Sequence, residues 1–460
     1  MATKTSVVIL AAGLGTRMRS KLAKVLHRAG GLTLIEHVVR AARAVADPAD
    51  IVAVVGHQAE AVAATVEPLG LRTALQAEQK GTGHAVAMAR PLLENAGGWL
   101  VVLYGDVPLL SAATVKRLVA EHEASGKDAT VMTCEIADPA AYGRIVRNAQ
   151  GNVAAIVEYK AASEEQRKIK EINSGIYCFR SDLVWKYIGE IQTNNPAGEY
   201  YLTDLVEIFN KNGHTVGAMQ IDDFNELLGI NNKVELAEMD AMFRTRKVRE
   251  LMLDGVTVER PETVMVDVDV RIAPDAWVEP FVRLTGSTVI GEDARIGSGS
   301  VIEDSTIGAG AQILPYSVIS ESEIGEGARV GPFARLRTHN TVGANCHIGN
   351  FVELKKTKMA AGAKANHLAY LGDAEIGAKT NVGAGTITCN YDGKHKFQTI
   401  IGEGAFIGSN STLVAPVTIG NEAYVAAGSV ITDEVPETSL ALGRARQTVK
   451  TGWKPKYKRS

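Results

Sequence analysis

The sequence has 460 residues, of which 46% are hydrophobic and 22% charged, and its formal net charge is −3. This length predicts two or three globular domains, and the nearly balanced charge excludes the strongly basic surface of a general nucleic-acid-binding protein. The sequence contains no apolar run of about 18 residues, so we predict no membrane span. The four cysteines form neither a zinc motif nor a disulfide framework, so we expect reduced thiols and a cytoplasmic location.

The first half of the sequence alternates short apolar runs with amphipathic stretches. Val7–Leu10, Ile51–Val55 and Leu100–Leu103 have the pattern of buried strands, and Leu32–Val45 and Ala112–Ala124 have the pattern of helices. This alternation predicts an α/β, Rossmann-like domain with a mostly parallel sheet and helices on both faces. Ligands bind at the carboxyl ends of the strands in such sheets, so residues that follow these strands are candidates for a binding site.

A glycine-rich turn follows the first predicted strand, in the segment 10–18 (LAAGLGTRM). Glycines let backbone N–H groups approach phosphate oxygens, and Arg17 and Lys24 can neutralise the charge of a polyphosphate. The segment lacks the Gly-Lys-Ser/Thr of a Walker loop and the third glycine of a dinucleotide fingerprint. Tyr104-Gly105-Asp106 ends another predicted strand, where the aspartate could ligate a metal or merely cap a helix.

The second half of the sequence contains a repeat. Apolar residues at helical spacing among many charges predict a linker helix over 232–254. Beyond this helix an aliphatic residue recurs every six positions, usually next to glycine, as in Ile290-Gly291, Ile296-Gly297 and Ile348-Gly349. A period of six predicts a parallel β-helix, in which three hexads form one triangular coil and the aliphatic side chains stack inside. The repeat has room for roughly ten coils between residues 264 and 436.

Two segments of the second half do not follow the repeat. The polar segment 388–397 (TCNYDGKHKF) interrupts the period of six, so we expect it to loop out of the solenoid as a binding element. The segment 444–460 is rich in Lys and Arg, which is typical of a solvated tail or of an arm that meets phosphates. Solenoids of this kind also serve as oligomerisation scaffolds, so the repeats alone do not predict an enzyme.

The glycine turn resembles the signature of sugar-1-phosphate nucleotidyltransferases. Further motifs of that family follow in the family's order: QAEQKGTGHA from Gln76, YGDVPL from Tyr104, YGRIVR from Tyr142, EINSGIY from Glu171 and GINN from Gly229. With the hexapeptide repeats, nearly the whole chain resembles the bifunctional N-acetylglucosamine-1-phosphate uridyltransferase/glucosamine-1-phosphate acetyltransferase family. This resemblance also implies that the β-helix is left-handed.

The resemblance implies that the first domain transfers UMP from UTP to N-acetylglucosamine 1-phosphate and releases pyrophosphate. Mg²⁺ would be held by Asp106 and Asn231, and Arg17 and Lys24 would stabilise the phosphates during in-line attack. The implied nucleotide and sugar contacts are Leu10, Ala11, Ala12, Gly13, Lys24, Gln76, Gly81, Thr82, Tyr104, Gly105, Asp106, Gly143, Glu158, Asn173 and Asn231. Leu14 and Ala23 depart from the family, in which a basic residue and a proline, respectively, are common at these positions. Neither departure removes a residue to which the resemblance gives a role, but both could alter the affinity for phosphate.

The β-helix carries residues of a second family site, in the motifs GPFARLR, FVELKK, NHLAYLGD and NVGAGTITCNYDG. An amine must lose a proton to attack a thioester, and imidazole ionises near neutral pH. We therefore expect His367 to be the general base that acetylates glucosamine 1-phosphate with acetyl-CoA. The implied sugar contacts are Arg337, Lys355, Tyr370 and Asn381, and the implied acetyl-CoA contacts are Ala384, Asn390, Tyr391, Ser409, Ala427 and Arg444.

The resemblance also implies a domain plan. It gives a uridylyltransferase domain at 1–233, a linker helix at 234–254, an acetyltransferase β-helix at 255–437 and a basic arm at 438–460. Members of the family are homotrimers with acetyl sites between neighbouring chains, so we expect a homotrimer. Its partners would be glucosamine 1-phosphate, acetyl-CoA and UTP, with no nucleic acid.

Two other interpretations stay open at this point. A monofunctional nucleotidyltransferase with a regulatory or oligomerising β-helix, similar to ADP-glucose pyrophosphorylases, would have a short solenoid without His367 and the Asn390-Tyr391 loop. A non-enzymatic protein, similar to nucleotide-exchange subunits of translation factors, would tolerate loss of Arg17, Lys24 or Asp106. The sequence retains all of these residues, which favours the bifunctional enzyme.

Overall fold

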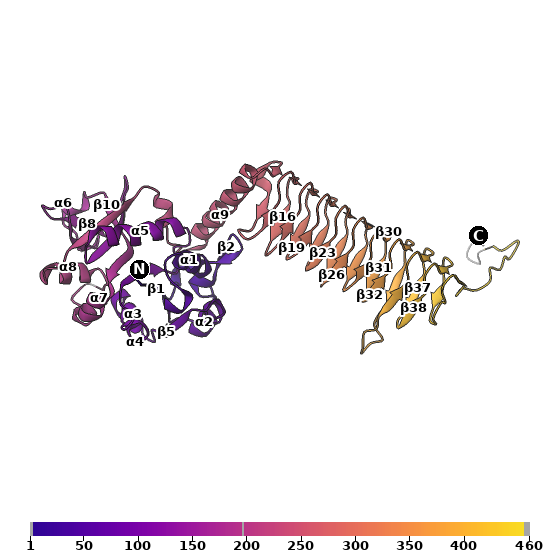
Figure 1. Ribbon diagram of the computed structural model, residues 1–460, viewed down its shortest axis with the longest axis horizontal. Coiled ribbons are helices and arrows are strands. Elements are labelled where there is room, and N and C mark those ends of the chain that lie inside the picture. Colours follow the sequence, from indigo (N-terminus) through magenta and orange to yellow (C-terminus); the bar gives the residue numbers. More distant parts are fainter. Residues whose placement is uncertain (1–2, 196, 455–460) are drawn as a thin grey trace, which may run out of the picture. The chain divides into compact units, whose positions relative to one another are not determined.

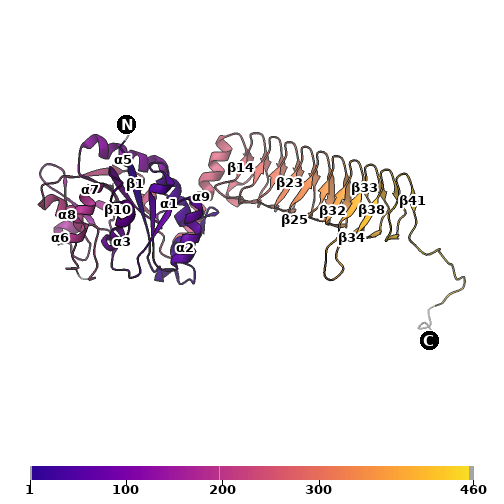
Figure 2. The ribbon, with the colours of Figure 1, turned by 60° about the horizontal axis from the view of Figure 1, so that its bottom comes forward.

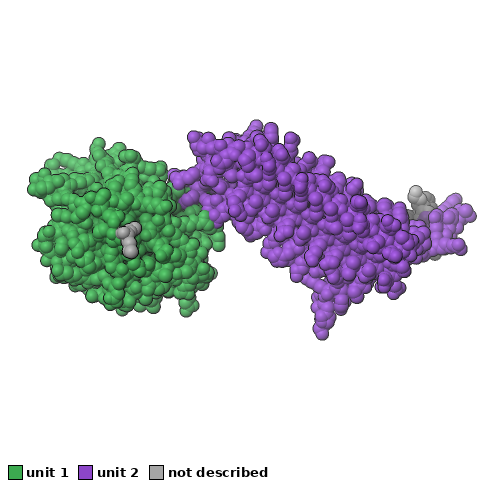
Figure 3. Space-filling view, viewed as in Figure 1, with its two compact units in different colours: residues 1–241 green, residues 242–460 purple. Residues whose placement is uncertain are grey.

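The structure is a computed structural model that describes residues 3–195 and 197–454. The chain forms two compact units, Met1–Ala241 and Met242–Ser460, which Figure 3 distinguishes by colour. Within the described residues, no helix is both long enough and apolar enough to cross a membrane. The predicted basic arm extends beyond the described part of the chain, because residues 455–460 lie outside it.

A sheet forms the centre of the first unit, with the strand order β11-β7-β10-β6-β1-β4-β5 and with β8 and β9 attached through β10 (Figure 1). Strands β6, β1, β4 and β5 are parallel to one another, as the alternation of apolar runs predicted. Strand β10 runs antiparallel to both β6 and β7. Within this strand order β10 alone is reversed, since β7 and β11 run in the same direction as β6, so the sheet is mostly parallel, as predicted.

The strands of this unit are short and its helices lie between them. The sheet strands are β1 (Thr5–Ala11), β4 (Ile51–Val55), β5 (Arg72–Leu75), β6 (Trp99–Tyr104), β7 (Ala129–Glu135), β8 (Arg144–Arg147), β9 (Val153–Val157), β10 (Glu171–Arg180) and β11 (Val216–Ile221), and a small hairpin joins β2 (Arg28–Ala29) to β3 (Leu32–Thr33). The helices are α1 (Leu34–Ala42), α2 (Ala59–Val66), α3 (Thr82–Met88), α4 (Arg90–Leu93), α5 (Ala112–Ser125), α6 (Glu164–Arg167), α7 (Ser181–Tyr187) and α8 (Asp204–Lys211).

Both faces of the sheet are covered, as the sequence predicted. All of β1 is buried, and its side chains alternate between two core clusters. Val7 and Ile9 pack with residues of α1, α2 and α5, whereas Val8 and Leu10 pack with residues of α3, α7 and α8. This double layer leaves the carboxyl ends of β1 and β6 as the edge where a ligand can enter.

Helix α9 (Lys233–Leu253) occupies the position of the predicted linker helix. After it, the second unit consists of three parallel sheets of 11, 10 and 9 strands. Each coil adds one short strand to each sheet, so that β12 pairs with β15, β13 with β16 and β14 with β17 (Figure 2). This is the parallel β-helix that the repeats predicted, and its left-handed coiling is the one that the family resemblance implied.

The aliphatic residues of the hexads form the core of the β-helix. Ile296, Ile313, Val330 and Ile348 pair in register on successive coils, and each is at most 1% exposed. Ile313 and Val330 are 17 residues apart, and Val330 and Ile348 are 18 apart. A coil can therefore be one residue shorter than three full hexads while its core residue keeps its place in the stack.

The strands of the three sheets fall at regular intervals along the chain. The first sheet contains β12 (Thr257–Val258), β15 (Trp277–Val278), β18 (Arg295–Ile296), β21 (Gln312–Ile313), β24 (Arg329–Val330), β27 (His347–Asn350), β30 (Lys364–His367), β33 (Asn381–Val382), β36 (Phe406–Ile407), β39 (Tyr424–Val425) and β41 (Leu440–Ala441). The second contains β13 (Met265–Val266), β16 (Arg283–Thr285), β19 (Val301–Glu303), β22 (Val318–Ser320), β25 (Arg335–Arg337), β28 (Glu353–Lys355), β31 (Tyr370–Gly372), β34 (Ile387–Cys389), β37 (Thr412–Val414) and β40 (Val430–Ile431). The third contains β14 (Arg271–Ile272), β17 (Val289–Ile290), β20 (Thr306–Ile307), β23 (Ser322–Ile324), β26 (Asn340–Val342), β29 (Lys358–Met359), β32 (Ala374–Ile376), β35 (Thr399–Ile401) and β38 (Val417–Ile419).

One loop leaves the β-helix between β34 and β35, and Figure 2 shows it projecting beside the label β34. The expectation that residues 388–397 loop out was wrong at its first two positions. Thr388 and Cys389 belong to β34 and pair with Leu413 and Val414. The loop begins at Asn390, because the buried Thr388 hydroxyl accepts a hydrogen bond from the Gly372 N–H in the preceding coil.

Candidate active sites

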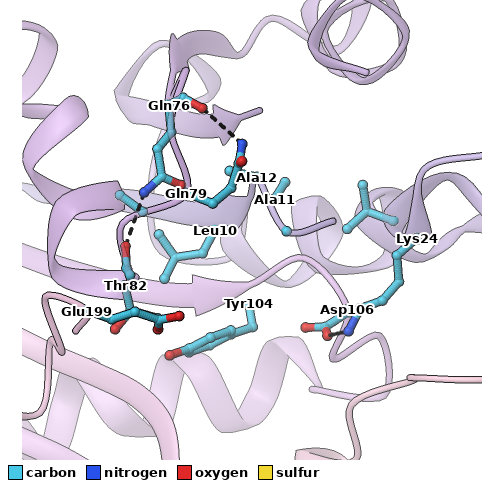
Figure 4. Close-up of a pocket in the computed structure, with 14 residues that line it drawn as sticks. Leu10, Ala11, Ala12, Lys24, Gln76, Gln79, Thr82, Tyr104, Asp106 and Glu199 are labelled. Carbon is cyan, nitrogen blue, oxygen red and sulfur yellow. Dashed lines mark hydrogen bonds and ion pairs between the residues drawn. The ribbon is translucent and has the colours of Figure 1, made fainter. Parts of the chain in front are cut away.

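A cavity of about 280 Å³ lies at the carboxyl ends of β1 and β6 in the first unit (Figure 4). Its lining residues are Leu10, Ala11, Ala12, Gly13, Lys24, Val25, Gln76, Gln79, Gly81, Thr82, Ala85, Tyr104, Asp106 and Glu199. This cavity brings together most of the residues that the sequence predicted to contact a nucleotide. The cavity is also lined by Val25, Gln79, Ala85 and Glu199, which were not predicted from the sequence.

Gln76 and Gly81 form one wall of this cavity. Gly81 has a φ of 107°, and a Cβ there would lie 2.6 Å from the carbonyl oxygen of Tyr200, so only glycine fits. The buried Gln76 amide donates one hydrogen bond to the Gly81 carbonyl, 3.1 Å away, and another to His84 Nδ1, 3.0 Å away. Both amide hydrogens are thereby used, which leaves the Gln76 amide oxygen as the group that can accept from a ligand.

Positive and oxygen-bearing side chains meet at the other end of the cavity. The Lys24 ammonium forms an ion pair with Asp106 (Figure 4). It also donates a hydrogen bond to Asn231 Oδ1, 3.1 Å away. Arg17 donates to the same Asn231 oxygen over 2.7 Å. The backbone keeps these groups together, since the Ile230 N–H donates to the Asp106 carbonyl. Arg17, Lys24, Asp106 and Asn231 therefore form one cluster, although the sequence places them far apart.

This cluster has the chemistry of a magnesium site. Asp106 and Asn231 offer a carboxylate oxygen and an amide oxygen, the ligands that hard divalent cations prefer. One ammonium group, that of Lys24, contacts both oxygens, so the two lie within reach of a single cation. The described residues hold no group of three or more His, Cys, Asp or Glu that could bind a metal alone. Two protein oxygens suit a Mg²⁺ ion that completes its shell with phosphates and water.

Gly143, Glu158 and Asn173 lie close together outside this cavity, and Glu158 lines a second cavity of about 530 Å³. The Asn173 N–H donates to the Gly143 carbonyl, and a Cβ on Gly143 would lie 3.5 Å from Glu158 Oε1. Burial raises the pKa of the Glu158 carboxyl, and burial also raises the pKa of the neighbouring Tyr104 phenol. Tyr104 therefore stays a neutral hydrogen-bonding group between the nucleotide cavity and these three residues.

In the β-helix, His367 lies at the end of β30 and is paired in register with Asn350 of the preceding coil. His367 Nδ1 lies 3.0 Å from Asn350 Oδ1. An amide oxygen can only accept a hydrogen bond, so Nδ1 carries the proton and Nε2 keeps its lone pair. This tautomer gives the exposed imidazole a free base at Nε2.

Two further cationic side chains, Arg337 and Lys396, gather around Lys355 in the β-helix. Arg337 and Lys355 occupy paired positions on successive coils, and Arg337 Nε donates to Glu353 Oε1 over 2.6 Å. Lys396, from the inserted loop, approaches Lys355 and lowers the pKa of its ammonium, with a smaller effect from desolvation. Two ammonium groups this close repel each other unless an anion lies between them, which indicates a phosphate site. Lys396 was not predicted from the sequence.

The remaining sugar candidates lie on the neighbouring coils. Tyr370 and Asn390 both border Gly372, where an added Cβ would lie 2.5 Å from the Tyr370 hydroxyl and 2.9 Å from Asn390 Nδ2. The Asn390 amide donates to the carboxylate of Asp373. Asn381 lies on β33, in register with Lys364 of β30, and is half-buried. Tyr391 is exposed in the loop, where its hydroxyl donates to the Gly393 carbonyl.

Four of the acetyl-CoA candidates lie along a single corner of the β-helix, whereas Asn390 and Tyr391 belong to the inserted loop. The Asn410 N–H donates to the Ala384 carbonyl, and the Gly428 N–H donates to the Ser409 carbonyl. The Arg444 guanidinium donates to the Ala427 carbonyl over 2.7 Å. Ala384, Ser409, Ala427 and Arg444 therefore stand on successive levels of one edge, as a long ligand would require.

Family comparisons agree with this division of the chain. Residues 7–170 match the model of the MobA-like NTP transferase domain, and residues 269–304 and 398–433 match the bacterial transferase hexapeptide model. The fold and the sites thus define a nucleotidyltransferase unit joined to a hexapeptide-repeat transferase unit.

Whole-chain relatives narrow this class to one family. The chain is 55% identical to the bifunctional protein GlmU of Solibacter usitatus, over 99% of the chain and 97% of the relative. It is 47% identical to the bifunctional protein GlmU of Koribacter versatilis (98% and 97% covered) and 47% identical to that of Streptococcus thermophilus (97% and 96% covered). The chain belongs to the GlmU family of bifunctional uridyltransferases and acetyltransferases. The monofunctional interpretation is not favoured, since the match extends through both units.

Proposed function

We propose that the two activities occupy separate units and together make UDP-N-acetylglucosamine. The β-helix acetylates glucosamine 1-phosphate with acetyl-CoA, and the first unit then transfers UMP from UTP to N-acetylglucosamine 1-phosphate. The limits that we propose for these parts are 1–233 for the uridylyltransferase, 234–254 for the linker helix, 255–437 for the acetyltransferase and 438–460 for the basic arm. The observation that carries the proposal is the Arg17–Lys24–Asp106–Asn231 cluster in one unit and the His367–Asn350 pair in the other.

In the first unit, the cavity residues bind and orient the UTP. The Gln76 amide oxygen accepts from the uracil ring, whose N3–H is a donor, and Leu10–Gly13, Gly81 and Thr82 enclose the base and ribose. Tyr104, Gly105, Gly143, Glu158 and Asn173 hold the N-acetylglucosamine 1-phosphate. This arrangement aligns a phosphate oxygen of the sugar with the α-phosphorus of UTP for in-line attack.

The cluster of Arg17, Lys24, Asp106 and Asn231 at the end of the cavity stabilises the negative charge of the phosphates during the reaction. Arg17 and Lys24 neutralise the phosphate oxygens as pyrophosphate leaves. Asp106 and Asn231 would hold Mg²⁺, which, when bound, adds Lewis-acid stabilisation of the phosphate charge. Positioning and charge neutralisation are the main requirements of phosphoryl transfer, and these four side chains supply both.

In the β-helix, His367 acts as the general base. Its Nε2 removes a proton from the amine of glucosamine 1-phosphate as the nitrogen attacks the thioester carbonyl carbon. The carbon–sulfur bond then breaks, and the imidazolium returns the proton to the departing CoA thiolate. Arg337, Lys355, Tyr370 and Asn381 bind the sugar phosphate, with Lys396 as a further contact, and Ala384, Asn390, Tyr391, Ser409, Ala427 and Arg444 bind acetyl-CoA.

We also propose a homotrimer that forms along an exposed apolar ridge of the β-helix. Tyr316, Phe333 and Phe351 stack at one corner, with ring centroids 5.4 Å apart, and Leu368 continues the row beside His367. Exposed apolar rows of this length are typical of protein interfaces, and this one would place a neighbouring chain next to the acetyl site. A cytoplasmic location fits the four free cysteines.

Two substitutions test whether the sites are separate. His367→Ala should reduce acetyl transfer at least about a hundredfold, the usual contribution of a general base, and leave pyrophosphate release from UTP within about twofold of wild type. Asp106→Ala should do the converse, since a lost metal ligand removes several kcal/mol of charge stabilisation. The measurement is mass spectrometry of both half-reactions with Mg²⁺ present. Loss of both activities in either variant would contradict separate sites.

A further inference from the structure

The segment that leads into Lys24 is poorly anchored by burial, although Ala23 and Val25, the neighbours of Lys24, are themselves buried. Residues 13–22 are exposed or half-buried apart from Met18. Several of its hydrogen bonds are local: the Met18 N–H donates to the Gly15 carbonyl, and the Leu22 N–H donates to the Ser20 hydroxyl. Such contacts shape the segment but do not hold it against the sheet. A cation that must meet a triphosphate at a fixed place needs a firmer support.

The side chain of Gln58 forms two hydrogen bonds that hold this segment. The Ala23 N–H donates to Gln58 Oε1 over 2.9 Å, and Gln58 Nε2 donates to the Lys21 carbonyl. Ala23 is the residue directly before Lys24 and is 2% exposed, so the bond to its N–H lies in a partly buried environment. The two bonds fix both ends of the tripeptide that leads into Lys24.

Gln58 is itself firmly held. It precedes α2 with φ 52° and ψ 44°, and its carbonyl accepts a hydrogen bond from the Val62 N–H in the helix. The neighbouring His57 N–H donates to the carbonyl of Ala12, which lines the nucleotide cavity. The junction of β4 and α2 thus contacts both the glycine turn and the segment before Lys24.

We propose that Gln58 is a positioning residue for uridylyl transfer, which holds Lys21–Ala23 so that Lys24 reaches Asp106, Asn231 and the nucleotide phosphates. This inference rests on the proposed role of Lys24 in binding UTP. It also gives a physical meaning to Ala23, where the chain departs from the proline that is common in the family. Ala23 has φ −55° and ψ 140°, a conformation that proline also adopts, but only a residue with an N–H can donate to Gln58.

Gln58 and a proline at position 23 are therefore alternative ways to fix the same backbone, and they exclude each other. In Ala23→Pro the ring Cδ takes the place of the hydrogen that points at Gln58 Oε1, so the variant clashes with Gln58. In Gln58→Gly both hydrogen bonds are lost, and glycine keeps the left-handed backbone without strain. In the double variant the ring restricts the backbone and the glycine leaves room for it.

The test is kcat/KM for UTP in the full-length protein with N-acetylglucosamine 1-phosphate and Mg²⁺. We expect Gln58→Gly to lower it about three- to tenfold, as the loss of one or two hydrogen bonds predicts, and Ala23→Pro to lower it by a similar factor. The double variant should return to within about twofold of wild type. Acetyl transfer, measured on the same samples, should stay unchanged in all three and serves as the control for folding.

Two outcomes would overturn the inference: an unchanged rate in Gln58→Gly, or losses in the single variants that multiply in the double variant. Lys24→Ala separates this failure from that of the proposed function. If Lys24→Ala is impaired and Gln58→Gly reduces the rate further by its full factor, Gln58 does not act through Lys24 and only the inference fails. If Lys24→Ala keeps the wild-type rate, the proposed role of Lys24 itself is wrong.

Discussion

At the scale of single residues, the proposed mechanism of acetyl transfer depends on the orientation of one imidazole. Asn350 Oδ1 accepts the hydrogen bond from His367 Nδ1, and this bond leaves Nε2 as the base. Asn350 acts through His367 and does not itself need to touch the substrate. Its contribution should therefore appear in the catalytic step rather than in substrate binding.

Asn350→Ala should lower kcat for acetyl transfer about tenfold and leave the KM for acetyl-CoA unchanged, because one orienting hydrogen bond is lost. Asn350→Asp retains an oxygen acceptor for Nδ1–H and should recover most of the rate. Steady-state kinetics of the two variants decide the matter. A rise in KM with constant kcat would show that Asn350 binds substrate instead.

His122, on α5 behind the first sheet, is a second residue with a testable consequence. Burial lowers the pKa of its imidazole to about 4, although the carboxylates of Asp128 and Glu123 oppose this effect. Below the ordinary value of 6.5 the unfolded chain binds a proton that the folded chain does not. The free energy of unfolding should therefore fall as the pH drops from 6.5 towards 4, by about 3 kcal/mol at most from this group.

His122→Asn retains a partner for Thr130 Oγ1, which lies 2.9 Å from His122 Nδ1, but does not titrate. The variant should lose less stability than wild type between pH 7 and pH 5. Urea unfolding at the two pH values measures the difference. Equal losses in both proteins would assign the acid sensitivity to other groups.

At the scale of elements, both sites are built where strands end or coils stack. Strand β27 carries Asn350 and strand β30 carries His367, and Gly349 of β27 lies against Asn366 of β30. A Cβ on Gly349 would lie 1.8 Å from the carbonyl oxygen of Asn366, so this position requires glycine. The coil that carries the base can approach its neighbour only because of this residue.

Gly349→Ala should push β27 and β30 apart and lower acetyl transfer about a hundredfold, as displacements of about 1 Å in an active site commonly do. Uridylyl transfer should stay within about twofold of wild type. Gly189→Ala, in the first unit, is the control, since its Cβ would meet nothing within 4 Å and its backbone is not left-handed. Comparable losses of acetyl transfer in the two variants would show that the close approach at Gly349 is not the cause.

Much of the secondary structure could be predicted from the sequence because its apolar residues recur with a regular period. The strand β4 was predicted with its observed bounds, and the period of six predicted the stacked core to which Ile296 and Ile348 belong. The antiparallel β10 could not be predicted, since a buried apolar run looks the same in either direction. The strand residues Thr388 and Cys389 were missed because they begin a polar segment that does not follow the aliphatic repeat, although they pair with β37.

The sites were predictable only in part. The sequence motifs named Lys24, Asp106 and Asn231, and the structure brings them together, while their roles stay predictions. Asn350 was missed although it lies one coil before His367, a spacing that a search by coil register would have found. The contact of Gln58 with Ala23 joins residues 35 positions apart without any repeat, so no sequence pattern indicates it.

At the scale of the whole molecule, the proposed homotrimer forms by association of the β-helices along the apolar ridge. Phe351, in the middle of the apolar ridge, is 56% exposed in the single chain. Phe351→Asp should shift the solution mass from three chains to one, because a carboxylate cannot be buried in that contact without a partner. Acetyl transfer should be lost and uridylyl transfer retained. Light scattering coupled to gel filtration gives the mass, and Leu75→Asp, an equally exposed apolar residue (59%) of the first unit, is the control.

The most direct measurement is a complementation assay with two variants, each of which should lack one of the two activities. His367→Ala and Asp106→Ala are each incubated with glucosamine 1-phosphate, acetyl-CoA, UTP and Mg²⁺, alone and mixed, and UDP-N-acetylglucosamine is quantified by mass spectrometry. Each variant alone should form almost none, and the mixture should form it readily, because one variant supplies N-acetylglucosamine 1-phosphate and the other consumes it. A mixture as inactive as its components, beside an active wild type, would contradict two independent sites in one chain.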